Sequence, residues 1–100
     1  MKLGTVNKQP AEVLTLSIDF TADLLDGETI GSAIVTTETL PELVDSSATM
    51  LEGIHAISGN VVTQRIKAGA DGDRHKLEMR VTTSAGDVYE HEIVVRVKEV

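Results

Sequence analysis

At 100 residues, with 16 acidic and 9 basic side chains and a net charge of −7, the chain has room for one domain and is poorly suited to bind nucleic acid or an anionic membrane. The absence of cysteine excludes disulfides and thiolate metal sites. With one Phe, one Tyr and no Trp, the core is expected to be aliphatic, and the aromatic platform typical of a sugar-binding site is missing.

Residues 1–10 show no hydrophobic periodicity, so we expect a flexible N-terminal arm followed by one domain over residues 11–100. The arm also lacks the apolar run of a secretory signal, and no segment has the roughly 18–20 apolar residues that cross a bilayer. We therefore expect folding in the cytoplasm and no membrane partner.

Two strands are predicted in the first half of the chain. Residues 14–20 alternate strictly between apolar and polar side chains, which favours a strand over the alternative, a helix running from Val13 to Leu24. Gly27 is expected to close this segment in a left-handed turn. The second strand is weakly polar on both faces, which indicates a central position, and Pro41 interrupts it. Its inward row is expected to be Ile30, Ser32, Ile34 and Thr36.

The middle of the chain gives weaker patterns. Residues 43–47 predict a short edge strand, and residues 61–67 predict a longer strand followed by a turn at 69–73. Residues 48–59 alternate in two conflicting phases, so their register stays open.

The last quarter of the chain predicts an antiparallel hairpin with one buried and one wet face. Apolar and polar residues alternate on both sides of a turn in which Gly86 suits the left-handed position of a three-residue loop with a G1 bulge. Thr83 then pairs with Asp87, and Leu77 faces Ile93 on the buried side. A loop longer by one residue would instead turn acidic side chains inward. On the outer face the preferred register sets these pairs: Arg80 opposite Glu90, and Glu78 opposite Glu92.

The spacing of these strands, with turn signals between them, predicts an all-β fold, an immunoglobulin-like antiparallel β-sandwich of about seven strands. Residues 71–77 partly match the D-x-G-x-Y-x-C pattern that opens a long strand in such sandwiches. His75 stands in the Tyr place and Leu77 in the Cys place. We expect the imidazole to donate a hydrogen bond back to the loop at 69–73.

The sequence carries no recognisable catalytic, cofactor-binding or metal-binding motif. His75 and His91 fall on neighbouring strands, but the expected register puts them roughly 13 Å apart along the strand, too far to share one zinc ion. The turn at 71–73 lacks the Glu that an EF-hand calcium loop needs at its twelfth position, where Thr82 stands. No nucleophile elbow, Walker loop or dinucleotide fingerprint occurs. We therefore expect no enzymatic activity, no cofactor and no metal ion.

Several stretches together carry a family resemblance: Val13-Leu14, Ile18-Asp19-Phe20, Leu24, Gly27-Glu28-Thr29-Ile30, the turn Thr82-Thr83-Ser84-Ala85-Gly86, Ile93 and Val97. Over about residues 13–98 the chain resembles small immunoglobulin-like proteins from the structural gene clusters of tailed phages and prophages, often described as tail-associated or fibre-tail adaptor proteins. The resemblance implies a structural or adaptor role in a virion and other phage tail or virion proteins as partners. The alternative is a free cytoplasmic module that recognises a small ligand or a host protein.

Residues 39–59 hold more apolar side chains than a simple loop needs. One interpretation is that a partner protein, or a second copy of the chain through self-association, covers part of this segment. The alternative is that these side chains pack in the core. The candidate contact residues are Leu40, Leu43, Met50, Leu51, Ile54 and Ile57.

Overall fold

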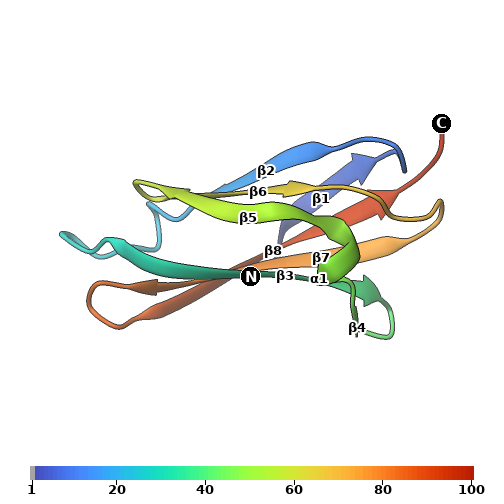
Figure 1. Cartoon of the computed structure of the whole chain (residues 1–100). Helices are drawn as coiled ribbons and strands as arrows, with labels where there is room; N and C mark the ends of the chain where they lie inside the picture. The colour runs from blue at the N-terminus through green and yellow to red at the C-terminus, as the bar shows by residue number, and fades with distance from the viewer. Residues whose placement is uncertain (1) are drawn as a thin grey trace.

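The structure is a computed structural model that describes residues 2–100, with the backbone alone described for residues 2 and 3. Two β-sheets pack face to face in a body 44 × 24 × 21 Å in extent (Figure 1). The larger sheet has the order β1-β8-β7-β3-β4, and the smaller sheet has the order β2-β6-β5. The element bounds are β1 Lys2–Lys8, β2 Leu14–Asp19, β3 Ile30–Leu40, β4 Val44–Asp45, α1 Ser47–Met50, β5 Leu51–Ser58, β6 Val61–Ile66, β7 Arg74–Thr83 and β8 Val88–Val97.

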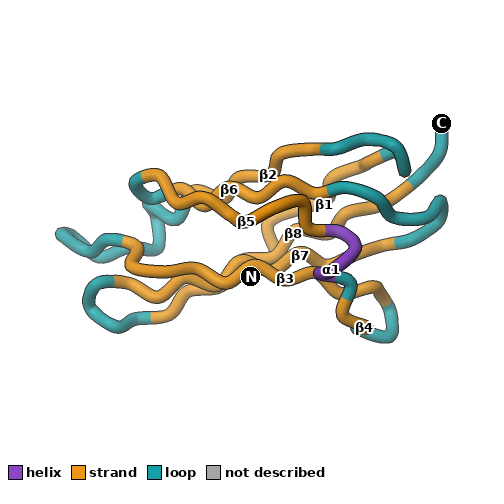
Figure 2. The backbone as a smooth tube through the Cα atoms, in the orientation of Figure 1, coloured by secondary structure: helices purple, strands orange, loops and turns teal. Residues whose placement is uncertain are grey.

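This strand order is that of an immunoglobulin-like sandwich. The trio β2, β6 and β5 corresponds to strands B, E and D, and the trio β3, β7 and β8 corresponds to strands C, F and G. Every paired neighbour is antiparallel except β1, which runs parallel to β8. The predicted fold class is therefore confirmed, with eight strands among residues 2–100 where about seven were expected. Figure 2 shows that the connecting loops gather at the two ends of the sandwich.

The predicted C-terminal hairpin is confirmed in its register and its turn. Leu77 pairs with Ile93, and the Thr83 N–H donates to the Asp87 carbonyl at 2.8 Å. Gly86 has a φ of 86°, as the left-handed position of the loop requires. The buried row of β7 and the facing row of β8 therefore lie on the same side of the sheet.

The core lies between the two sheets and is built mainly from aliphatic side chains, because alternate residues of β2, β6, β7 and β8 point inward. Phe20 directly follows β2 and is fully buried. The predicted strands at 14–20 and 61–67 and the left-handed turn at Gly27, with a φ of 81°, are confirmed. The buried cluster consists of Leu16, Ile18, Phe20, Val35, Val62, Ile66, Leu77, Met79, Val81, Ile93, Val95 and Val97.

The predicted inward row of β3 is wrong beyond its first residue. Ile30 packs against the core, but Ile34 is 61% exposed, while Val35 and Thr37 are buried. The pairing with β7 shifts between Ile30 and Ser32, so an inserted residue exchanges the two faces of the strand. The strand is also not central over most of its length, because β4 pairs only with the residues near its end.

The expected arm at residues 1–10 also needs correction, since β1 occupies most of it; Met1 lies outside the described residues. Hydrophobic periodicity does not reveal this strand, because backbone pairing with β8 holds it in place. Among its described side chains, Val6 is the hydrophobic residue that packs against the core. Lys8 ends the strand with its side chain buried, and its ammonium donates to the carbonyls of Ala68 at 2.6 Å, Gln9 at 2.8 Å and Pro10 at 3.1 Å.

The segment whose register stayed open contains a β-bulge. The pairing of β5 with β6 is interrupted between Glu52 and Ala56, where Gly53 has a φ of 73°. The buried side chain of Gln64 fills the irregularity and donates to the Gly53 carbonyl at 3.0 Å. The two conflicting alternations of residues 48–59 are explained by α1 and the bulge. Leu51 and Ile57 keep one phase and pair with Ile66 and Val62, whereas Met50 belongs to α1 and Ile54 lies in the unpaired part of β5.

Candidate docking surfaces

The structure divides the six candidate contact residues between core and surface. Met50 is fully buried and Leu51 packs against the core, so for these two the core alternative is correct. Ile54 protrudes from the bulge of β5 and is 92% exposed. The remaining candidates are half-buried or exposed: Leu40, Leu43 and Ile57. The surface part of this segment therefore lies along β5 and around the short β4.

A buried polar network ties the start of β7 to the connection that follows β4. The Ser46 hydroxyl donates its proton to Thr37 Oγ1 at 3.0 Å, so Ser46 Oγ accepts a hydrogen bond from Nδ1 of His75 at 3.1 Å. His75 Nε2 lies 3.6 Å from Asp73 Oδ2, with no hydrogen-bond partner among the described residues. The expected bond back to the loop at 69–73 is therefore replaced by one to Ser46. Burial lowers the pKa of His75, and the neighbouring Asp73 carboxylate only partly offsets that effect.

The Ser46, His75 and Asp73 side chains superficially resemble a catalytic relay, but their geometry supports a structural role. A serine nucleophile must pass its proton to the imidazole, and here the Ser46 hydroxyl donates to a threonine instead. The imidazole is also buried, which keeps it from an incoming substrate. The network holds the β4 connection against β3 and β7.

At the other end of the sandwich, Glu28 joins the β2–β3 loop to the β7–β8 turn. Its Oε2 accepts from Thr83 Oγ1 at 2.6 Å, and its Oε1 accepts from the Leu25 N–H at 2.8 Å. These hydrogen bonds, Thr83 first, lower the pKa of Glu28. The Asp87 carboxyl shares a hydrogen bond with Glu28 and faces its negative charge, which raises the pKa of Asp87. The two loops are thus fixed to each other rather than free.

A second contact fixes the same loop to the sheet. His91 Nε2 lies 2.6 Å from Asp23 Oδ2, and its ring centroid is 5.0 Å from that of Phe20. His91 is buried opposite Met79, as the hairpin register predicted. The loop between β2 and β3 is therefore held at both of its ends.

The outer face of the larger sheet carries paired charges along most of its length. Arg80 bonds Glu90 at 2.9 Å and lies 3.4 Å from Glu78, while Lys76 contacts Glu38 at 3.4 Å and Glu92 at 3.8 Å. Arg80 thus bridges Glu78 and Glu90, and Lys76 bridges Glu38 and Glu92. Glu78 and Glu92, which face each other across β7 and β8, therefore each contact one cation. Toward the ends of these strands Arg74 stands opposite Arg96, and neither forms an ion pair with the described residues.

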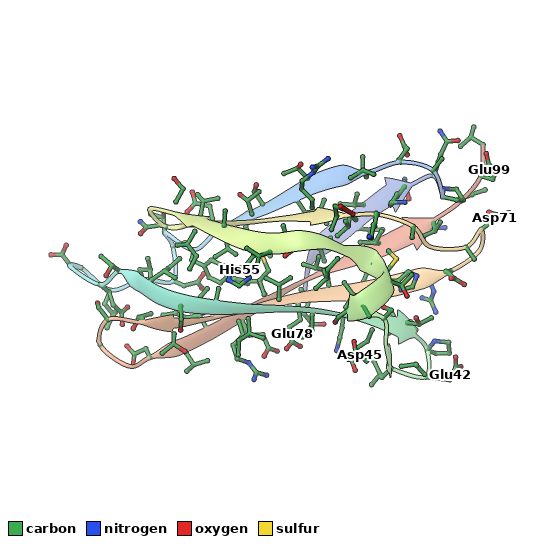
Figure 3. All side chains as sticks on the ribbon, in the orientation of Figure 1. Glu42, Asp45, His55, Asp71, Glu78 and Glu99 are labelled. Carbon is green, nitrogen blue, oxygen red and sulfur yellow. The ribbon has the colours of Figure 1, made fainter. Side chains whose placement is uncertain are left out.

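Within the part of the chain that the structure describes, no three His, Asp or Glu side chains gather in a way that could hold a metal ion. In Figure 3, His55 lies near the middle of the molecule, while Asp71 and Glu42 lie toward one end. Likewise, none of the helices in residues 2–100 combines the length and the hydrophobicity needed to cross a membrane.

The chain folds into an immunoglobulin-like sandwich, and side-chain contacts in its polar clusters hold the loops at both ends in place. The family model described as Podophage GP4 fiber-tail adaptor protein gp77 matches residues 8–96. The chain therefore belongs to this family, and the predicted resemblance to a phage tail adaptor is confirmed. No curated protein matches the chain. The family gives the chain a structural role in a phage tail, at the attachment of a fibre.

Proposed function

We propose that the protein is a non-enzymatic adaptor of a phage or prophage tail that works by docking to other tail or virion proteins. The observation that carries this proposal is the family match, which extends from the end of β1 to the penultimate residue of β8. No cofactor is required for such a role.

Loops that are held in place by side-chain contacts are well suited to an adaptor. Pre-organised surfaces lose less conformational entropy on binding than mobile ones do. Glu28 and His91 hold one end of the sandwich, while Lys8 and His75 hold the other. The docking surfaces are then the exposed loops and strand edges between these fixed points.

The charge of the chain favours protein partners. At a net charge of −7 the protein is repelled by nucleic acid and by anionic lipid, so neither is a proposed partner. We place its synthesis in the cytoplasm of the bacterial host and its final location in the virion.

Quantitative mass spectrometry of purified particles tests this proposal. We expect the chain in fixed stoichiometry with tail proteins, and we expect a tagged copy to retain tail or fibre proteins when particles are dissociated. A capsid-internal protein measured in the same samples controls for recovery. If the chain is expressed during infection but is missing from particles, the adaptor role is wrong, and the free cytoplasmic module becomes the better account.

A further inference from the structure

One edge of the larger sheet is open over the first part of β3. This strand has 11 residues, but its register with β4 covers only Glu38 and Thr39. At Thr37 the edge is closed by side-chain and backbone bonds: the Ser46 N–H donates to the Thr37 carbonyl at 2.9 Å, and the Thr37 N–H donates to Ser47 Oγ at 3.0 Å. Before Thr37, no described strand pairs with this edge. Figure 1 shows β4 only beside the far end of β3.

The direction of the free backbone groups follows from Thr37. Its N–H and C=O point away from β7, toward the open edge, because they bond Ser46 and Ser47. Backbone groups of an antiparallel strand alternate in direction with a period of two. The N–H and C=O of Val35 and Ala33 therefore also point outward, and no described residue bonds them.

This open edge has none of the usual protections against strand pairing. The residues from Ser32 to Thr36 include no charge and no proline, and the bulge of β3 lies before them. Ile34 projects from the outer face and is 61% exposed. An uncharged, β-branched edge with free hydrogen-bonding groups is a template for another strand.

We propose that this edge pairs with the same edge of a second copy of the chain, antiparallel, with Ile34 on the two-fold axis. Ala33 of each copy then faces Val35 of the other, and each of these pairs exchanges two backbone hydrogen bonds. The two Ile34 side chains meet in a non-hydrogen-bonded pair on the outer face. The pairing joins two larger sheets into one continuous sheet.

The second copy is the favoured occupant because the edge is complementary to itself. In this register Ser32 faces Thr36 of the other copy, so no like charges stand opposite within the paired segment. The length also fits, since the strand of the other copy must leave the edge where β4 begins to cover Glu38. A two-fold contact closes at two copies and leaves no further edge of this kind exposed.

Single-cysteine variants test the register directly, because the chain has no cysteine of its own. In Ile34→Cys the two thiols lie across a pair with Cα atoms about 4.5 Å apart, within the range that a disulfide spans. The matched control is Ser32→Cys, on the same face of the same strand. Its two cysteines lie four positions apart, roughly 13 Å, in the proposed dimer. We expect mild oxidation to give a covalent dimer of the first variant only. Equal cross-linking of both variants, or of neither, overturns the proposal.

Sedimentation equilibrium of the full chain tests the association itself. We expect a concentration-dependent dimer, and we expect the dissociation constant to rise about tenfold or more in Ile34→Lys. Ala33→Pro should have the same effect, because it removes an outward N–H that the β3–β7 ladder does not use. Val13→Lys adds the same charge at an exposed site before β2, in the smaller sheet, and should leave the constant unchanged. A wild-type chain that stays monomeric up to about 1 mM, or that uses this edge only for a different protein, contradicts the proposal.

Discussion

Gly86 and His75 show how single residues set local structure in this protein. Gly86 has a φ of 86° and donates its N–H to the Thr83 carbonyl at 3.0 Å, which closes the β7–β8 turn. His75 is buried in the place where an immunoglobulin-like sandwich often has a tyrosine, and it reaches Ser46 instead of the preceding loop. Both residues were singled out from the sequence, but only the turn could be predicted in full, because it depends on neighbours along the chain.

Replacing Gly86 with valine should destabilise the protein by about 1–2 kcal/mol, because a β-branched side chain is strained in the left-handed region. Gly86→Asn is the matched control, since asparagine tolerates this conformation better. Urea unfolding followed by circular dichroism measures both variants. Equal free energies of unfolding for wild type and the valine variant would show that the turn does not require this backbone conformation.

His75 makes the free energy of unfolding depend on pH, and the burial of its side chain determines the direction of that dependence. Burial lowers its pKa below the ordinary value of 6.5, so near that pH the unfolded chain binds more protons than the folded one. The stability it supports is therefore present above about pH 6.5 and is lost as the pH falls through the lowered value. We expect wild type to lose more stability between about pH 7.5 and 5.5 than His75→Gln does. Parallel slopes in thermal unfolding of the two proteins across this range would refute the prediction.

At the scale of elements, the sequence predicts the strands whose pairing is continuous and fails for the strands whose pairing is interrupted. The alternation of β2 and of the hairpin is unbroken, so their faces and the hairpin register follow from a period of two. In β3 one extra residue shifts the pairing, so every later residue changes face. In β5 two extra residues interrupt the pairing, and the residues between Glu52 and Ala56 leave the ladder. A glycine lies at each irregularity, Gly31 and Gly53, but glycine alone does not distinguish a bulge from a turn.

The candidate docking segment contains both a core residue in α1 and an exposed residue in the bulge of β5, and these two residues provide a test. Met50 ends α1 with its side chain in the core, whereas Ile54 stands out from the bulge. Met50→Ala should cost about 2–5 kcal/mol of unfolding free energy, because it leaves a cavity. Ile54→Ala should stay within about 0.5 kcal/mol of wild type. Chemical denaturation of both variants measures the difference, and a comparable loss in Ile54→Ala would mean that this side chain supports the fold.

At the scale of the whole molecule, the described contacts link distant parts of the chain into one body. Lys8 at the end of β1 bonds the carbonyl of Ala68, and Glu28 bonds Thr83. Composition and strand spacing predicted the sandwich, because each strand needs a second sheet to cover its apolar face. They did not predict β1, whose attachment depends on backbone bonds and on one buried ammonium.

Whether β1 belongs to the folding unit is therefore the question to test at the scale of the whole molecule. We expect wild type to unfold in one cooperative transition, and we expect removal of residues 1–8 to lower its free energy of unfolding by at least about 2 kcal/mol, because the β1–β8 hydrogen bonds are lost and the Ala68 carbonyl loses its donor. Removal of Val100, which is 98% exposed, controls for shortening the chain. Urea titration followed by circular dichroism and by Tyr89 fluorescence should give coincident curves for each protein. An unchanged midpoint after removal of residues 1–8 would instead mean that the folding unit begins near residue 11 and that β1 is an appendage, as the lack of periodicity predicted.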